Sequence, residues 1–230
     1  ALEKNGLAEN TLVICTTDHG IAFPGMKCNL TDAGIGVMLI MRGPGGFTGG
    51  KGVDALVSHI DLFPTICDVI GIDRPNWLQG TSFMPVMRGD AEDVREEIYA
   101  EVNYHAAYEP QRCVRTKRWK YIRRFDDRSK PVLPNCDHGL SKDVWMAHGW
   151  PQRNVPSEAL YDLIFDPNET HNLVGHEETQ EVLAGMKARL EAWMRDTEDP
   201  LLKGAVQAPS GAEVNDADGI NWSEKTRIVA

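Results

Sequence analysis

Two adjacent residues with metal-binding side chains, Asp18 and His19, stand at the end of a short apolar segment. Residues 11–17 read Thr-Leu-Val-Ile-Cys-Thr-Thr, with apolar side chains on both faces of a predicted strand. This pattern is typical of a strand buried between helices, as in a parallel sheet. Ligands bind beyond the carboxyl ends of such strands, so Asp18 and His19 are candidate ligands of a catalytic metal. A plain strand-to-loop turn is the alternative interpretation, because Asp is also a common turn residue.

A candidate anion-binding group, Lys27, follows nine residues after Asp18 in a loop that contains Gly and Asn. Its ammonium is a compact point charge, which suits the neutralisation of negative charge on a tetrahedral oxyanion centre. A loop lysine by itself is usually a plain surface residue. The prediction for Lys27 therefore depends on its proximity to Asp18 and His19.

Alternating and apolar segments along the chain predict an α/β fold. The predicted elements comprise part of a large mixed sheet flanked by helices, then a small C-terminal antiparallel sheet with a packed helix. A long Pro-, Asp- and His-rich loop is expected over 126–158, and an extended tail over 200–230. The expected strands are 11–17, 36–42, 98–102, 112–115, 119–123 and 159–163, and the expected helices are 57–71 and 177–195.

The change in pattern near residue 95 predicts three regions. Residues 1–94 are expected to form an α/β region, and residues 95–199 a small antiparallel α+β subdomain. Residues 200–230 complete the chain as the tail. A strand that is apolar on both faces needs neighbours on both edges, and only 36–41 offers itself as a partner for 11–16. We therefore expect an N-terminal half, outside these residues, to complete the sheet.

The composition excludes several classes of function. The formal net charge of −10 argues against nonspecific nucleic-acid binding, which depends on the neutralisation of phosphates. No apolar run approaches the length of a membrane span, so no membrane partner is expected. The five cysteines form no C-x-x-C pair and no zinc-binding spacing, which favours free thiols.

Five segments in order resemble the later half of a sulfatase of the alkaline-phosphatase superfamily. The resemblance extends over about residues 1–198 and is closest to the heparan N-sulfatase (sulfamidase) branch. It implies that residues 1–94 are the C-terminal part of the sulfatase α/β catalytic domain. The segments are Thr-Leu-Val-Ile-Cys-Thr-Thr-Asp-His-Gly (11–20), Val-Asp-Ala-Leu-Val-Ser-His-Ile-Asp-Leu-Phe-Pro-Thr-Ile (53–66), Leu-Gln-Gly-Thr-Ser (78–82), Arg-Cys-Val-Arg-Thr-Lys-Arg-Trp-Lys-Tyr-Ile (112–122) and Leu-Tyr-Asp-Leu-Ile-Phe-Asp-Pro-Asn-Glu-Thr-His-Asn-Leu (160–173).

The resemblance implies roles for particular residues and a hydrolysis of sulfate esters or sulfamates. It implies that Asp18 and His19 bind the divalent cation, and that Lys27 contacts the sulfate group of a sulfated small molecule or glycan. It further implies that Tyr104, His105 and Arg112 border the substrate pocket, as substrate-binding residues. Calcium is the expected cation, although an imidazole ligand also suits Mn or Zn, and Mg is a further candidate.

This sequence departs from the family pattern at the nucleophile. The family uses a formylglycine made from Cys or Ser within C/S-x-P/A-x-R, and none of the five cysteines has that context. The chain alone is therefore expected to be inactive and to need the missing N-terminal half. Two alternatives stay open: a phosphodiester or phosphonate monoester hydrolase of the same superfamily, and a non-catalytic glycan-binding or assembly module.

Overall fold

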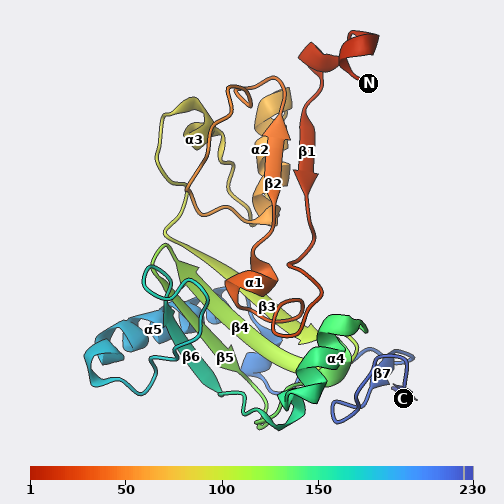
Figure 1. The fold of residues 1–230 in the computed structure, drawn as a ribbon. Helices are drawn as coiled ribbons and strands as arrows, with labels where there is room; N and C mark the ends of the chain where they lie inside the picture. Colours follow the sequence, from red (N-terminus) through yellow and green to blue (C-terminus); the bar gives the residue numbers. More distant parts are fainter. Residues whose placement is uncertain (225, 230) are drawn as a thin grey trace. The chain divides into compact units, whose positions relative to one another are not determined.

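The computed structural model describes residues 1–224 and 226–229, and the chain divides into two compact units. The first unit contains Ala1–Asp18 and Val37–Ile98, and the second contains His19–Gly36 and Tyr99–Ala230. Helices and antiparallel strands occur in both units, which confirms the α/β class (Figure 1).

The first unit is built on a two-stranded sheet and a helix. Strand β1 (Val13–Thr16) pairs antiparallel with β2 (Leu39–Arg42). Helix α2 (Leu62–Ile70) follows a capping box between Ser58 and Asp61, and it ends at a glycine in the left-handed conformation. The core of this unit is formed by Phe47 and Phe83 with Met84 of α3 (Met84–Arg88).

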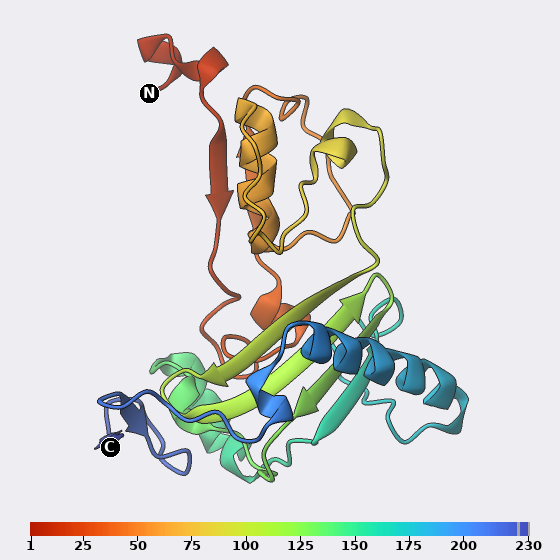
Figure 2. The same ribbon diagram turned by 180° about the vertical axis from the view of Figure 1, so that it is seen from behind.

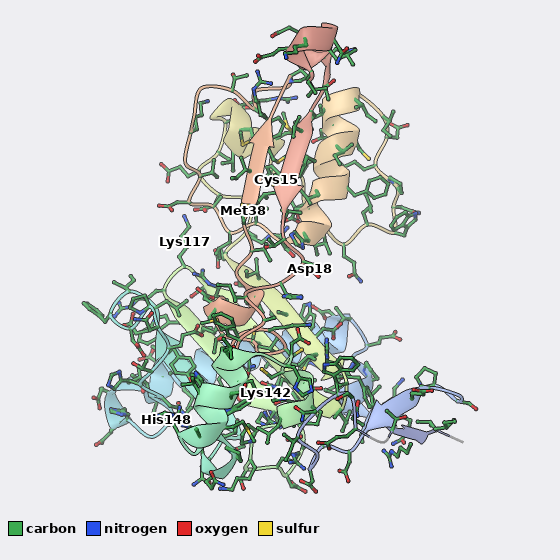
Figure 3. The ribbon with its side chains drawn as sticks, turned by 45° about the vertical axis from the view of Figure 1, so that its right-hand side comes forward. Cys15, Asp18, Met38, Lys117, Lys142 and His148 are labelled. Atoms are coloured by element: carbon green, nitrogen blue, oxygen red, sulfur yellow. The ribbon has the colours of Figure 1, made fainter. Side chains whose placement is uncertain are left out.

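The environment of β1 differs from the expected parallel sheet. The strand pairs antiparallel, and its only hydrogen-bonded neighbour in the described part of the chain is β2. Val13 is 39% exposed and Ile40 on the facing strand is 59% exposed. In Figure 3 the two strands can be found by the labels of Cys15 and Met38. The pairing of this strand with 36–41 was expected, but the two strands run antiparallel, because an apolar pattern indicates that a strand needs cover and carries no information about the direction of its neighbour.

The second unit is a four-stranded sheet with apolar residues packed on both faces. The strand order is β3-β4-β5-β6, and β4 and β6 both pair antiparallel with β5. On one face, Val114, Tyr121 and Leu160 pack against α5, which crosses the sheet in Figure 2. On the other face, Cys113 and Ile122 pack against Leu30 and its neighbours. The bounds are β3 (Glu97–Tyr104), β4 (Tyr108–Thr116), β5 (Trp119–Arg124), β6 (Glu158–Asp162), α1 (Asp32–Ile35) and α5 (Gln180–Asp196).

The buried face of α5 is the apolar stripe that the sequence predicts. Leu183, Met186, Leu190 and Met194 are buried at helical spacing, and Tyr99 stacks on Trp193 at a centroid distance of 4.9 Å. Strands β3, β5 and β6 confirm the predicted elements to within two residues at each end. Strand β4 begins four residues before the expected 112, and α5 begins three residues after the expected 177, because a 3-10 turn covers Glu177–Thr179.

The segment 126–158 is more ordered than predicted, because it contains helix α4 (Leu140–Ala147). The helix lacks an apolar stripe that a sequence pattern would reveal. Leu140 is 84% exposed and Val144 is also exposed, whereas the charged Lys142 points inward and is buried. Lys142 is labelled on α4 in Figure 3.

The predicted tail also has structure. Strand β7 (Glu213–Asn215) pairs antiparallel with β8 (Thr226–Ile228), after a 3-10 turn over Pro200–Leu202. These short elements escape prediction because they depend on contacts with distant loops. In the part of the chain that the structure describes, no helix has the length and apolar character needed to cross a membrane.

Candidate functional site

The loop 19–36 of the second unit carries His19 and Lys27, and it is folded tightly onto itself. The Gly20 amide donates to the Gly34 carbonyl at 2.9 Å, and the Lys27 amide donates to the Ile21 carbonyl at 3.1 Å. A side chain at Gly20 would place its Cβ 1.8 Å from the Ala33 carbonyl oxygen, so only glycine fits there. The close approach of the two glycines fixes the path of the loop that presents Lys27.

The Lys27 ammonium forms an ion pair with Asp137. Its Nζ lies 2.8 Å from Oδ2 of Asp137, and the two side chains are 16% and 37% exposed. This hydrogen bond from Lys27 holds the pKa of the Asp137 carboxyl below its ordinary value, while partial burial acts in the opposite direction. Asp137 is therefore ionised at neutral pH, and it fixes the position of the Lys27 ammonium.

Two histidines belong to the same electrostatic neighbourhood. His105 lies in the short loop between β3 and β4, and the pKa of its imidazole is lowered by partial burial and then by the charge of Lys27. His19 also lowers the pKa of His105, and both histidines lower the pKa of Asp137. Of the predicted site residues, Lys27 contacts Asp137 directly, whereas His19 and His105 act on it through their charge. We call His19, Lys27, His105 and Asp137 the cationic cluster.

Asp18, the other predicted metal ligand, is exposed two residues after the end of β1 (Figure 3). Its neighbour His19 has Nδ1 2.6 Å from the Gly20 carbonyl oxygen. Because a carbonyl only accepts hydrogen bonds, this contact places a proton on Nδ1 and leaves the lone pair of the neutral imidazole on Nε2. Metal-bound histidines commonly have this arrangement, in which the second nitrogen donates to a backbone carbonyl.

The chain's own donors supply only part of a metal site. Among residues 1–224 and 226–229, no group of three or more His, Cys, Asp and Glu side chains is arranged to hold a metal ion. Asp18 and His19 are two donors, whereas calcium takes six to eight ligands and zinc four. Two donors are too few for either ion, so the role of Asp18 and His19 as metal ligands stays a prediction.

Cys28, next to Lys27, is not a nucleophile at neutral pH. Burial raises the pKa of its thiol to about 12, although the charge of Lys27 acts in the opposite direction. A thiol with that pKa is protonated at pH 7, and the thiolate is the reactive form of cysteine. The cationic cluster therefore contains charge and proton-transfer groups but no activated nucleophile from this cysteine.

Tyr104, a predicted substrate-binding residue, is engaged with a C-terminal segment. Its hydroxyl donates to the Val206 carbonyl at 3.0 Å, and the Val206 amide donates to the Tyr108 hydroxyl at 3.1 Å. The two tyrosine rings lie 4.8 Å apart. The pair of tyrosines therefore anchors the chain near Val206, and a substrate contact by Tyr104 stays a prediction.

Arg112, also predicted to bind substrate, is fully buried. Its guanidinium contacts both carboxylate oxygens of Asp199, with Nε at 2.5 Å and Nη2 at 3.1 Å. Its remaining hydrogen bonds go to the Val102 and Gln111 carbonyls and to Asn103. This bidentate pairing joins β4 to the segment after α5. A substrate contact by Arg112 also stays a prediction.

Sequence reasoning missed Asp137 and the residue that positions its loop, Asn135. The buried Asn135 amide makes two bonds to Ala107: it accepts from the Ala107 amide at 2.8 Å and donates to the Ala107 carbonyl at 3.2 Å. It also donates to Glu109, which pairs with Arg124. Asn135 thus ties the Asp137 loop to the His105 loop. The available signal was the Asp- and His-rich composition of 126–158, which points to a functional loop but selects no residue in it.

Comparison with known proteins finds a protein family that matches part of this chain. The family described as "N-sulphoglucosamine sulphohydrolase, C-terminal" matches residues 27–135. The chain is 28% identical over 212 residues to an ulvan-active sulfatase of Formosa agariphila, covering 88% of this chain and 41% of that protein. It is also 28% identical over 236 residues to the human N-sulphoglucosamine sulphohydrolase, covering 91% of this chain and 46% of that protein.

The fold matches solved sulfatases as well. The structure of a 2-O GAG sulfatase superposes with a TM-score of 0.68 at 26% identity, covering 90% of this chain and 41% of that chain. The chain spans less than half the length of each of these three relatives.

Proposed function

This chain belongs to the sulfatases, as a C-terminal portion of their fold, and from that premise we propose that the whole polypeptide hydrolyses sulfate esters or sulfamates. The observation that carries the proposal is the cationic cluster, in which the Lys27 ammonium pairs with the ionised Asp137 carboxylate and two histidines lie within electrostatic range of that carboxylate. The substrate is a sulfated small molecule or glycan. A tetrahedral sulfuryl group has several oxygens on which such a cluster stabilises negative charge.

Lys27 contacts a sulfuryl oxygen of the substrate. Its ammonium has three donor hydrogens, and one of them points to Asp137 at 2.8 Å. The ion pair holds the ammonium in place before substrate binds, so less side-chain entropy is lost on binding. His105, in the same neighbourhood, contacts the substrate beside Lys27. In this proposal Tyr104 on β3 and Arg112 on β4 border the substrate pocket.

Asp18 and His19 hold the divalent cation, with further ligands from the region of the protein that this chain does not cover. The bonding of Nδ1 to the Gly20 carbonyl supports Nε2 as the ligand atom of His19. Calcium is the proposed ion, with Mg, Mn and Zn as the alternatives that metal analysis distinguishes. A bound divalent cation supplies Lewis-acid stabilisation of charge on sulfuryl oxygens.

The nucleophile comes from the missing N-terminal half of the same protein. The sequence contains no C/S-x-P/A-x-R, and the relatives are more than twice as long as the region matched. The exposed apolar residues Val13 and Ile40 on β1 and β2 are the surface that this half covers. Hydrogen exchange tests the proposal: the amides of 13–16 that do not face β2 become protected only in the complete polypeptide. A monomeric 230-residue chain with a cooperative melt and fully protected amides 13–16 would contradict it.

The decisive experiment replaces Lys27 by Ala in the complete polypeptide, with the exposed Lys117→Ala as the matched control. Loss of a comparable charge stabiliser lowers turnover about ten- to a thousandfold, so Lys27→Ala is expected to lose that much activity on an aryl sulfate and on glucosamine N-sulfate. Unchanged kinetics would rule out the role of Lys27. Faster hydrolysis of an aryl phosphate than of the aryl sulfate would favour the phosphoester branch. Glycan binding without turnover would favour a binding module.

A further inference from the structure

The C-terminal segment 206–223 crosses both loops that carry the cationic cluster. The Asn215 amide donates to the Ala106 carbonyl at 2.8 Å, one residue after His105. On the side of the other loop, Lys142 donates to the Ile220 carbonyl at 2.7 Å and to the Cys136 carbonyl at 2.9 Å, one residue before Asp137. The segment is therefore fixed beside the cluster by buried hydrogen bonds.

One aromatic side chain of this segment, Trp222, combines a fixed position with a large exposed surface. Its ring meets the ring of His138 edge to face, with centroids 6.4 Å apart and planes at 69°. His138 Nε2 lies 3.3 Å from the Ser223 hydroxyl, and the Trp222 carbonyl accepts from Asn215. Trp222 nevertheless stays 52% exposed. Because His138 directly follows Asp137, the indole contacts the loop that carries Asp137.

Other aromatic residues near these loops are already used inside the protein. Tyr104 and Tyr108 pack against each other and both bond to Val206. Trp145 lies edge to face with Trp150, and the Arg153 guanidinium covers its ring at 4.7 Å. Trp222 also has a ring contact, with His138, but about half of its surface stays exposed to solvent, which is a costly feature for an indole that is held in place.

We propose that Trp222 is a stacking platform for a pyranose ring of the substrate, adjacent to the sulfated group that the cationic cluster binds. This inference rests on the proposed function and extends it to a substrate class: a sulfated glycan of at least two sugar units, rather than a simple sulfate ester. The aliphatic C–H face of a pyranose packs on an indole face, which removes apolar surface from water. Lys27 then contacts the anionic group, and Trp222 packs against the apolar face of the sugar.

The experiment uses the complete polypeptide with Trp222→Ala, Trp222→Tyr and the control Trp77→Ala, which removes an indole that is 68% exposed in the other unit. A sulfated disaccharide is the substrate, and inorganic sulfate, which has no ring, is the competitive inhibitor. Trp222→Ala is expected to raise KM for the disaccharide about tenfold with kcat within about twofold, since loss of an aromatic contact costs a few-fold to tens-fold in affinity. The inhibition constant of sulfate is expected to stay unchanged.

Each other outcome overturns the proposal. An unchanged KM in Trp222→Ala means that the indole does not contact the sugar. Equal losses of affinity for the disaccharide and for inorganic sulfate mean that Trp222 only maintains the structure of the cluster. A failure of Trp222→Tyr to recover most of the lost affinity has the same meaning. If the wild-type protein hydrolyses no sulfated substrate, the proposed function fails separately. Calorimetric binding of the disaccharide to wild type and Trp222→Ala then still tests the platform.

Discussion

Lys27 and Asp137 form a 2.8 Å ion pair although 110 residues separate them in the sequence. The pair joins the loop after β1 to the loop before α4, and both loops belong to the second unit. It also places His105 and His19 in one electrostatic neighbourhood. This contact and the buried side chains of Arg112 and Lys142 have measurable consequences for titration and stability.

The charge of Lys27 contributes, after burial, to the lowered pKa of His105. Lys27→Met removes a positive neighbour that disfavours the imidazolium, so the pKa of His105 is expected to rise. The Asp137 carboxylate, left without its partner, adds to the rise. NMR titration of the imidazole nitrogens measures the pKa directly and needs no activity. The control Lys117→Met should leave the His105 titration unchanged, and a lowered or constant pKa in Lys27→Met would refute the arrangement.

The ion pair contributes to stability in a defined pH range. The folded pKa of Asp137 lies below its ordinary value of 3.8, so the contribution is fully present above that value and is lost as the pH falls through the folded pKa. Urea unfolding of Asp137→Asn against wild type should therefore show the largest difference at pH 7 and a shrinking difference toward pH 3. Exposed Asp143→Asn is the control. A difference that grows on acidification would contradict the sign.

Arg112 stabilises the fold through its buried pairing with Asp199. Arg112→Met leaves that carboxylate buried without its cation, which is expected to cost about 3–5 kcal/mol of the free energy of unfolding. Arg123→Met is the control, because Arg123 pairs with Glu191 at the surface at 3.8 Å and should cost about 1 kcal/mol or less. Chemical denaturation measures both. A cost for Arg112→Met as small as that of the control would show that the pairing is not structural.

Lys142 holds the C-terminal segment against the Asp137 loop. Its buried ammonium donates to the carbonyls of Leu133, Cys136 and Ile220, and Lys142→Met leaves all three without this donor. The loss is expected to reach about 2–4 kcal/mol, since each unsatisfied buried carbonyl costs about 1–3 kcal/mol and some regain water. Faster hydrogen exchange should concentrate at 133–138 and 217–223. Exposed Lys203→Met is the control, and uniform exchange across the chain would contradict the local role.

Local patterns in the sequence predict the second unit's main elements and part of the candidate site. The stripe of Leu183, Met186, Leu190 and Met194 predicts α5 and its buried face, because a helix repeats every 3.6 residues. The alternation in 112–123 predicts the β4–β5 hairpin for the corresponding reason. Periodicity is a local property, and it is therefore readable from neighbouring residues alone.

Only the tertiary structure decides the contacts that make the site. Asp137, Asn135 and Trp222 carry no local pattern, and their partners Lys27, Ala107 and His138 lie up to 110 residues away. The inward-pointing Lys142 of α4 even reverses the usual pattern, because a buried ammonium satisfied by backbone carbonyls leaves no signature in side-chain types. The sequence by itself determined the strands β3 to β6, the helix α5, and that Asp18, His19 and Lys27 follow the first strand, but not α4, β7 or β8. Long-range packing alone determined which charges and rings meet, since a hydrogen bond depends on position in space and not on separation along the chain.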